Sequence, residues 1–434
     1  MGSAAVSHRR MKLDPVLSPD RNGAIADVHS RPLRQIVFAD ILVTMASALD
    51  CDVLVAGGGP AGLAVAITAR MSGLSAIVIE RQPSLPDKAC GECLMPPAVS
   101  ALNRLGVLDL IDPARRASID GIRFKQEGAA SAEARLPSPG GLGVRRTELT
   151  AAMMHRARWL GAEIHERTSL RGYRIQQDQV LAETDVGPVR ARFLAAADGL
   201  HSRMRSMAGL QATSSGPRRF GIRQHFQIKP WSRFVEVHFT DGVEAYVTPV
   251  GPMRVGVTFL WDDARVARHG ASIDRLLERF PSISVRLAGA VTDSRPRGAG
   301  PMACSARSRI ADRFALVGDA AGYIDAITGE GLSLALVSAL TLGRILPTAL
   351  ELGGSRETLL AYQRESARQF RRYAFVTKIM LAFARRPALH GPVIAVLAQY
   401  PQMFSALLHF AVGSRPTREV PENTRSLSPA ESHD

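Results

Sequence analysis

Residues 51–80 read CDVLVAGGGPAGLAVAITARMSGLSAIVIE. A short apolar run of strand type ends in glycines, an alanine-rich helical stretch follows, and a second apolar run ends in Glu80. Gly57, Gly59 and Gly62 fit the pattern G-x-G-x-x-G. In such a turn the first glycine permits the tight bend, the second lets the backbone approach a pyrophosphate, and the third allows the helix to pack on the strand. Glu80 follows at the distance where a carboxylate can bind a ribose. We therefore predict a dinucleotide site.

Length and composition are those of an ordinary globular protein. The chain has 434 residues, of which 46% are hydrophobic and 22% charged, and this length favours two closely packed domains. The net charge of +14 comes almost wholly from arginine. Because the arginines are scattered and no basic stripe alternates with aromatic residues, we predict no nucleic-acid binding.

The four cysteines are too few and too scattered for a secreted disulfide protein. Cys90 and Cys93 have C-x-x-C spacing, but no second pair or histidine cluster completes a zinc site, so we predict no metal. The chain lacks an apolar run of about 18 residues and a secretory signal. We therefore expect a cytoplasmic protein.

Hydrophobic periodicity divides the chain into segments. Residues 1–44 have no sustained period, so we expect a disordered leader and regard Met45 as an alternative start. Strands alternate with helices over residues 45–217, and a buried-strand pattern returns within residues 300–350, which predicts a discontinuous domain built on a doubly wound sheet. Residues 218–299 alternate with period two, as in an antiparallel sheet. Helices are expected over residues 351–420 and a disordered tail over residues 421–434.

Two further motifs accompany the glycine-rich turn. Residues 196–205, AADGLHSRMR, fit A-D-G-x-x-S-x-x-R, and residues 316–331, LVGDAAGYIDAITGEG, fit a G-D-A-A segment followed by paired glycines. Together with GGGPAG they resemble the fingerprints of the flavin-dependent monooxygenase superfamily of the para-hydroxybenzoate hydroxylase fold. That superfamily also includes flavin-dependent halogenases and geranylgeranyl reductases. The three motifs occur in the order found in that superfamily.

The resemblance implies a fold of α/β class: a Rossmann-type FAD-binding domain with an inserted antiparallel β-sheet substrate domain and C-terminal helices. It implies FAD as cofactor and NAD(P)H as a transient electron donor. Arg205 is carried over with Asp198 from the A-D-G motif as a candidate for binding both. The cofactor-binding residues that it implies are Gly57, Gly59, Pro60, Ala61, Gly62, Glu80, Arg81, Arg146, Asp198, Asp319, Gly329, Gly331 and Leu332.

For the reaction, the resemblance favours a monooxygenase that uses O₂ to hydroxylate or epoxidise an apolar or aromatic small molecule through a flavin C4a-hydroperoxide, in secondary metabolism. The tryptophans are isolated, so the W-x-W-x-I-P motif of halogenases is absent. Reduction of isoprenoid double bonds stays open, because Cys90-Gly91-Glu92 resembles geranylgeranyl reductases and Gly322 stands where many aromatic hydroxylases have histidine. A flavin-binding protein without oxygenase chemistry is the third alternative.

No catalytic residue is assigned from the sequence. His225, His238 and Tyr246 lie on strands that we expect to face the flavin, where they would relay protons or simply pack. Three interpretations of Cys90 and Cys93 stay open: small packing residues, a redox pair beside the flavin, or a modified thiol.

The helices near the C-terminus also admit two interpretations. Their large apolar residues pack over the substrate domain, or they touch a membrane surface where a lipophilic substrate enters. The second interpretation would use the arginines Arg371, Arg372, Arg385 and Arg386. The oligomeric state is left open.

Overall fold

The computed structural model describes residues 49–83, 87–129, 131–176, 178–213, 218–264, 266 and 271–413. The expected leader, the alternative start at Met45 and the expected tail lie outside the described residues. Everything below concerns the compact unit that begins at Leu49.

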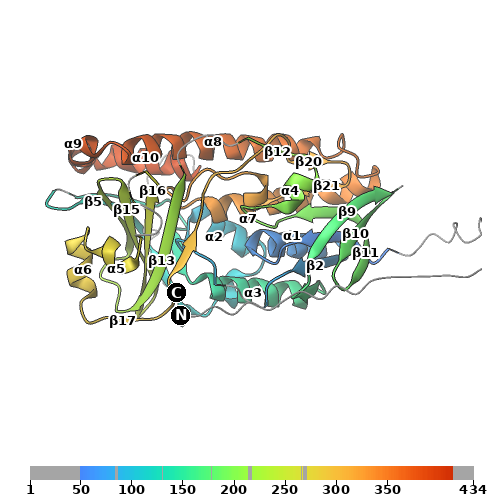
Figure 1. Cartoon of the computed structure of the whole chain (residues 1–434), viewed down its shortest axis with the longest axis horizontal. Coiled ribbons are helices and arrows are strands. Elements are labelled where there is room, and N and C mark those ends of the chain that lie inside the picture. Colours follow the sequence, from blue (N-terminus) through green and yellow to red (C-terminus); the bar gives the residue numbers. More distant parts are fainter. Residues whose placement is uncertain are drawn as a thin grey trace, which may run out of the picture. The chain divides into compact units, whose positions relative to one another are not determined.

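The first sheet is the one predicted from the glycine-rich turn, with strand order β20-β21-β11-β1-β2-β8 (Figure 1). Strand β1 is parallel to its neighbours β11 and β2, and β8 and β21 continue the parallel pattern. The central strands are apolar on both faces, as buried parallel strands require. The bounds are β1 Cys51–Ala56, β2 Ala76–Glu80, β8 Glu163–Glu166, β9 Leu170–Gln176, β10 Gln179–Thr184, β11 Gly187–Ala196, β20 Ile310–Ala311 and β21 Phe314–Leu316.

Helices cover this sheet and form a hydrophobic core with it. Helix α1 begins at Pro60, whose fixed φ suits the first helical turn and whose missing N–H is not needed there. Helix α7 contacts α1 and α2. It is long and apolar enough to cross a membrane, but 56% of its apolar window is buried inside the protein, as in a core helix. The bounds are α1 Pro60–Met71, α2 Pro96–Arg104, η2 Leu108–Leu110, η3 Pro113–Arg115, α3 Arg146–Trp159, α4 Arg203–Met207, η5 Gly318–Ala321 and α7 Gly331–Glu351.

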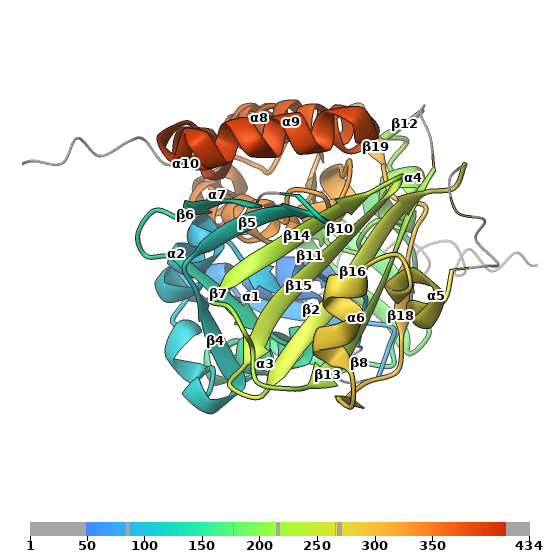
Figure 2. The same cartoon turned by 90° about the vertical axis from the view of Figure 1, so that its left-hand side faces the viewer.

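The second sheet has the order β17-β13-β16-β15-β14-β5-β6, and Figure 2 shows its broad face. Strands β13 to β16 form the predicted antiparallel pattern, and helices α5 and α6 lie beside them. The bounds are β5 Gly121–Gln126, β6 Ser131–Arg135, β13 Arg219–Gln227, β14 Phe234–Thr240, β15 Val243–Gly251, β16 Arg254–Asp262, α5 Ile273–Leu277, α6 Pro281–Leu287, β17 Val291–Thr292 and β18 Arg297–Ala299.

The predicted domain boundary differs from the structure at one segment. Strands β5 and β6, expected in the first domain, belong to the second sheet, because β5 pairs in parallel with β14. Local periodicity shows that a segment is a strand but not which distant strand it will pair with. Short strands connect the two parts: β3 Cys93–Leu94, β4 Arg116–Ile119 and β7 Gly141–Val144 form one small sheet, and β12 Gln211–Ala212 pairs with β19 Ser305–Ala306.

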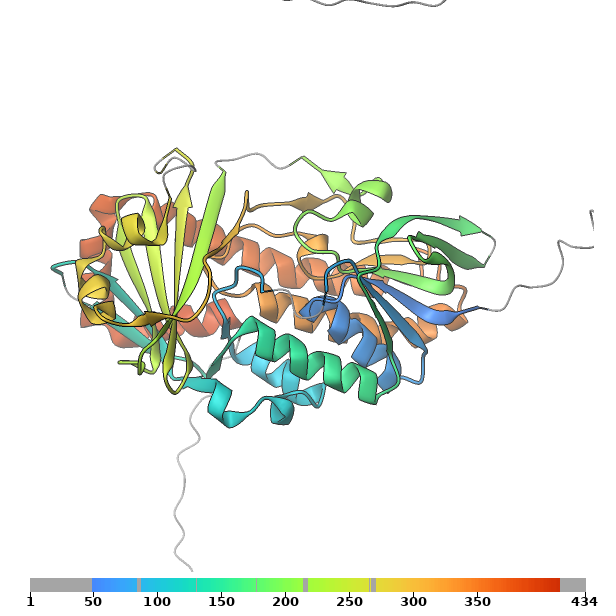
Figure 3. The same ribbon diagram turned by 60° about the horizontal axis from the view of Figure 1, so that its bottom comes forward.

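The C-terminal helices are α8 (Leu360–Ala384), α9 (Pro387–Gln399) and α10 (Pro401–Val412). Helix α8 packs on α7, whereas α9 and α10 contact strands β5 and β6. These helices therefore run past both sheets (Figure 3). Prolines at the first turns of α9 and α10 mark the two changes of direction.

Candidate functional site

A cavity of about 1700 Å³ extends from the glycine-rich turn to the face of the second sheet. Nearly all the residues predicted to bind the cofactor line it, although they come from five separate stretches of chain. These are Gly57, Gly59, Pro60, Ala61, Glu80, Arg81, Arg146, Asp198, Asp319, Gly329, Gly331 and Leu332. The structure thus brings together what the motifs suggested, and the role of each residue remains a prediction.

The glycines of the turn have distinct reasons to be glycine. Gly57 has φ +108°, and a Cβ there would lie 2.5 Å from the carbonyl oxygen of Ala197. A Cβ on Gly62, which does not line the cavity, would lie 1.9 Å from the carbonyl oxygen of Gly57. At Gly59 the nearest atom to such a Cβ is Nη2 of Arg146, 3.6 Å away. The turn therefore closes tightly at its ends and exposes its backbone in the middle.

Two helices begin at this cavity without a capping side chain. Gly59, the N-cap of α1, has no side chain, and the side chain of Glu330, the N-cap of α7, accepts no hydrogen bond from its helix. Pro60 and Gly331, the first residues of the two helices, line the cavity. The first N–H groups of a helix, with the helix dipole, attract negative charge. The cavity thus offers two separated positions for anionic groups of a ligand.

Acidic side chains are held in defined positions along the cavity. Glu80 accepts hydrogen bonds from the N–H of Gly58 (2.8 Å) and of Gln82 (2.9 Å), which orients its carboxylate at the turn. Burial raises the pKa of Asp319, while the charges of Arg146 and Lys88 oppose that rise. Asp319 therefore lies in the cavity wall within the influence of two cationic side chains.

The A-D-G motif chiefly holds neighbouring segments of the chain together through hydrogen bonds. Asp198 accepts hydrogen bonds from the hydroxyl of Ser202 (2.5 Å) and the N–H of Met204 (3.1 Å) and so fixes the start of α4. Arg205 is buried and donates to the carbonyl oxygens of Ala320 (3.0 Å) and Leu200 (3.0 Å). Arg205 does not line the cavity and joins the motif to the G-D-A-A turn, so its role in binding the cofactor stays a prediction.

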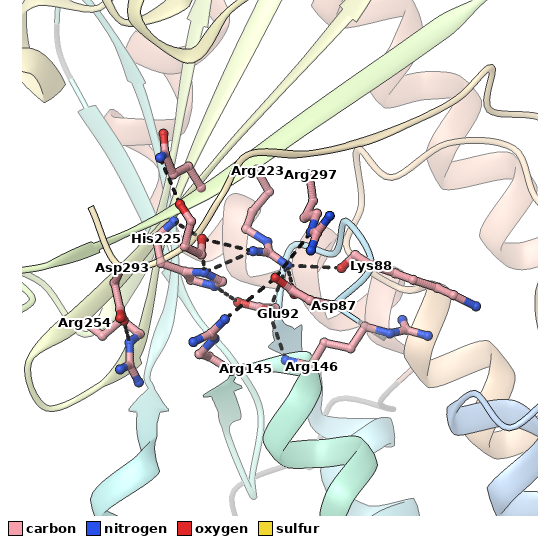
Figure 4. Close-up of polar contacts among 12 residues, drawn as sticks. Asp87, Lys88, Glu92, Arg145, Arg146, Arg223, His225, Arg254, Asp293 and Arg297 are labelled. Atoms are coloured by element: carbon pink, nitrogen blue, oxygen red, sulfur yellow. Dashed lines mark hydrogen bonds and ion pairs between the residues drawn. The ribbon is translucent and has the colours of Figure 1, made fainter. Parts of the chain in front are cut away.

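A polar cluster centred on Glu92 lies where the two sheets meet (Figure 4). Glu92 lines the cavity, is 2% exposed and has φ +57°. Its Oε1 accepts a hydrogen bond from the N–H of Arg146 (2.9 Å), and its Oε2 lies 2.5 Å from Nε2 of His225. Nδ1 of His225 lies 2.9 Å from the hydroxyl oxygen of half-buried Ser294. Hydrogen bonds therefore run from the cavity, through a fully buried imidazole, toward the surface.

Arg223 indicates which nitrogen of His225 carries the proton. Its Nη1 lies 3.0 Å from Nδ1 of His225, and because a guanidinium can only donate, that nitrogen accepts. Nε2 then donates to Glu92. Arg223 also donates to Asp87 (2.5 Å). Burial would raise the pKa of Asp87, but the hydrogen bond and charge of Arg223 hold it below its usual range.

The other predicted catalytic candidates divide between the two faces of the second sheet. Tyr246 lines the cavity, and its hydroxyl donates to the carbonyl oxygen of Ile327 (3.0 Å), next to the loop that precedes α7. The expectation that His238 faces the flavin is wrong. Val237 points into the cavity, so the alternation of a strand turns His238 to the opposite face, where it lies 3.4 Å from Glu236.

Cys90 and Cys93 line the cavity as free thiols. Burial raises the pKa of Cys93 to about 12 and raises that of Cys90 as well. A thiol reacts as a nucleophile through its thiolate, which these surroundings disfavour. The geometry therefore favours the packing interpretation of this pair.

The end of the cavity at the second sheet is apolar. Strands β5, β14 and β16 contribute one wall, and helices α8 to α10 contribute the other. The wall residues include Ile122, Phe124, Val237, Leu260, Met380, Phe383, Val393, Leu397, Phe404 and Leu408. This end suits an apolar or aromatic ligand.

A buried ionic cluster supports the sheet near Tyr246. Arg219 lies 2.7 Å from Glu244 and 2.8 Å from Asp325. Burial raises the pKa of Glu244 to about 7, against the lowering effect of Arg219. Within the residues that the structure describes, no group of three or more His, Cys, Asp or Glu side chains could hold a metal ion.

Sequence reasoning missed the residues around His225. The sequence could have indicated Glu92, because this residue lies inside the Cys90–Cys93 segment that resembles known flavoproteins. Arg223 and Ser294 had none, because they come from distant strands and loops and meet only in the folded chain.

Comparison with known proteins agrees with this architecture. Residues 50–374 match the family described as FAD binding domain. The chain is 26% identical over 411 residues to 6-methylpretetramide 4-monooxygenase of Streptomyces rimosus, covering 85% of this chain and 93% of the relative. It is 26% identical over 317 residues to digeranylgeranylglycerophospholipid reductase 2 of Methanopyrus kandleri, covering 70% and 78%. The structure of the Diels-Alderase PyrE3 has the same fold, with a TM-score of 0.67 at 22% identity over 85% and 81% of the two chains.

Proposed function

The chain belongs to the FAD binding domain family, a family of FAD-dependent oxidoreductases, and on this premise we propose that it is a monooxygenase. The proposed reaction hydroxylates or epoxidises an apolar or aromatic small molecule, with O₂ as co-substrate and NAD(P)H as electron donor. We assign it to secondary metabolism in the cytoplasm, with contact to a membrane through the C-terminal helices.

The residues present fit FAD. The exposed backbone at Gly59 and the uncapped start of α1 suit a pyrophosphate, and the oriented carboxylate of Glu80 suits the adenosine ribose. At the other end, Asp319 and the uncapped start of α7 suit the polar chain and the ring of the flavin. When bound, FAD supplies the electron transfer and the activation of oxygen.

The observation that carries the proposal is the continuity of the cavity. The same cavity joins the FAD-binding motifs to the apolar wall formed by the second sheet and the C-terminal helices. An apolar substrate there lies next to the end of the cavity where the flavin ring is expected, and the walls exclude water from the reacting atoms.

Glu92, His225 and Ser294 are the proposed proton path. In this path His225 Nε2 passes its proton to Glu92 at the cavity while Nδ1 takes up a proton from the hydroxyl of Ser294, which solvent water replaces. The hydrogen bond from Arg223 to Nδ1 then favours return of the ring to the form that is protonated on Nε2. Arg223 holds the imidazole in the orientation that this path requires. Tyr246 orients the loop before α7 through its bond to Ile327.

Anaerobic reduction of the purified flavoprotein with NADH or NADPH, followed by mixing with O₂ and candidate substrates, tests the proposal. Product mass analysis should find one oxygen atom from ¹⁸O₂ in the product, with one O₂ consumed per nicotinamide oxidised. Failure of every apolar substrate to promote oxygen incorporation would exclude a monooxygenase.

The second candidate is reduction of isoprenoid double bonds. Two observations favour it: the similarity to an archaeal digeranylgeranylglycerophospholipid reductase, and Gly322 in the G-D-A-A segment. Gly322 has φ +139°, and a Cβ there would lie 3.1 Å from the ring of Phe370, so a histidine at this position would be strained in this chain. Saturation of an isoprenoid under anaerobic conditions would support the reductase. If the protein binds flavin but turns over no substrate, the result would support the third alternative, a flavin-binding protein without oxygenase chemistry.

A further inference from the structure

The C-terminal helices carry a group of exposed apolar side chains. Of the nineteen large apolar side chains that are exposed in the described residues, eight lie between residues 375 and 410. The rings of Phe375 on α8 and Phe410 on α10 are more than half exposed yet contact each other edge to face, 6.3 Å between centroids. The apolar face consists of Phe375, Ile379, Leu389, Val396, Tyr400, Met403, Leu407 and Phe410. Exposed apolar patches of this kind mark interaction sites.

The same helices are positively charged. Residues 366–413 contain six arginines and lysines and no aspartate or glutamate. Arg371, Lys378 and Arg386 are exposed. Arg371 and Lys378 have the spacing that places them on the side of α8 that carries Phe375 and Ile379, and Arg386 follows the end of α8 at Ala384. Within the described part of the chain, these three cations form no ion pair, whereas Arg368 pairs with Glu365 and Arg385 with Asp262. The apolar face is therefore bordered by unpaired positive charge.

The geometry of these helices suits contact with a bilayer surface rather than insertion across it. Helices α9 and α10 have 13 and 12 residues and are bent by 105° relative to each other. A spanning helix needs about 20 residues, so neither crosses a membrane. Amphipathic helices of this length lie in the interface, with apolar side chains among the acyl chains and basic side chains at the headgroups.

The apolar face is continuous with the cavity. All of its residues except Tyr400 also line that cavity. A molecule dissolved in a bilayer under these helices would thus meet apolar side chains along the whole route to the second sheet. Covering the face by a bilayer would keep this route free of water.

We propose that the apolar face docks on the surface of an anionic lipid bilayer. A second copy of the chain is a poorer occupant, because a symmetric contact would bring Arg371, Lys378 and Arg386 of both copies together. Anionic headgroups complement these charges instead. The inference does not rest on the proposed oxygenation, since the apolar face and its charges are the same whichever reaction the cavity supports, and vesicle binding is measured without turnover.

Co-sedimentation of the purified flavoprotein with lipid vesicles tests docking. The vesicles contain phosphatidylcholine alone or with about one third phosphatidylglycerol, and binding is expected with the anionic vesicles and to weaken as salt rises. Replacing Arg371→Gln, Lys378→Gln and Arg386→Gln together should weaken that binding about tenfold to a hundredfold. The charge-matched control carries Arg104→Gln, Arg275→Gln and Arg356→Gln, three exposed arginines elsewhere, and should bind as the wild type does.

A second pair of variants tests the apolar contribution. Phe375→Ser with Leu407→Ser should weaken binding to anionic vesicles at least tenfold, whereas Val186→Ser with Val285→Ser, equally exposed elsewhere, should not. FAD content and circular dichroism show that each variant is folded.

Three results would overturn the proposal. The first is that the wild type does not bind anionic vesicles. The second is that the two charge variants lose binding equally, which would reflect net charge alone. The third is that sedimentation velocity finds a dimer that Phe375→Ser with Leu407→Ser dissociates, which would make the face an interface between copies.

Discussion

Glu92 Oε2 and His225 Nε2 lie 2.5 Å apart, although 133 positions separate them in the chain. Glu92 follows strand β2 of the first sheet along the chain, and His225 lies on β13 of the second sheet. The pair is nearly inaccessible to solvent, with 2% and 0% exposure. It therefore connects the two parts of the structure at the wall of the cavity.

We expect this pair to govern proton transfer. Glu92→Gln should slow re-oxidation of the reduced flavin by O₂ and flatten the pH dependence of that rate, with a loss of about a hundredfold, typical of losing a positioned acid or base. His225→Gln should act similarly. Stopped-flow absorbance at several pH values measures the effect. His238→Gln is the matched control, because that ring faces away from the cavity, and an equal loss there would contradict the assignment.

The glycine-rich turn should not accept a methyl group. Gly62→Ala places a Cβ 1.9 Å from the carbonyl oxygen of Gly57, so the helix must shift away from the strand. We expect most bound FAD to be lost, as measured by the ratio of flavin to protein absorbance after purification. Gly172→Ala is the control, since the nearest atom to its Cβ is a glutamate oxygen 3.8 Å away. Full FAD content in Gly62→Ala would show that the turn does not bind the cofactor.

Arg219 should be important for stability. Arg219→Ala leaves the buried Glu244 and Asp325 without their cation, which is expected to cost about 3 to 5 kcal/mol in the free energy of unfolding. Urea unfolding at pH 8 measures it. An exposed pair provides the comparison: Arg174→Ala removes the partner of Glu183 and should cost less than about 1 kcal/mol.

Glu330 should make stability fall as pH rises. Burial raises its pKa from 4.5 to about 7, opposed by Arg372, so between these values the folded state binds the proton more tightly than the unfolded state. The contribution to stability is then complete below pH 4.5 and is lost as the pH rises to about 7.

Glu330→Gln should remove this dependence and stabilise the flavin-free protein at pH 8 by up to about 3 kcal/mol. Unfolding by urea at pH 5 and pH 8 (roughly, either side of this range) measures the change. The exposed Glu351→Gln should not alter it, and a Glu330→Gln profile parallel to the wild type would refute the assignment.

The thiols at the cavity should be dispensable for electron transfer. Because burial raises the pKa of both Cys90 and Cys93, they stay protonated near neutral pH. A Cys90→Ser, Cys93→Ser double variant should reduce its flavin with NAD(P)H at the wild-type rate. A rate at least tenfold lower, with normal FAD content, would instead support a redox pair.

Local sequence was sufficient for the elements that depend on neighbours in the chain. At Gly62 the steric need for glycine lies within the turn, whereas at Gly57 it comes from the distant Ala197. Glu80 and Asp319 follow apolar runs that are visible in the sequence. The alternation of strands and helices, and the period of two after residue 218, likewise follow from which side chains must be buried.

Pairing and orientation were decided by the tertiary structure. Strand β5 joins the second sheet because β14 offers it a free edge, and His238 points away from the cavity because the register of that strand turns Val237 inward. Glu92, Arg223 and Ser294 show no local pattern that would assemble them. The nucleotide-binding turn and the order of the motifs could be predicted from the sequence, because the glycine pattern and the apolar runs beside it are local features. The proton path, the apolar end of the cavity and the exposed helical face depend on which distant segments pack together, and only the fold decided them.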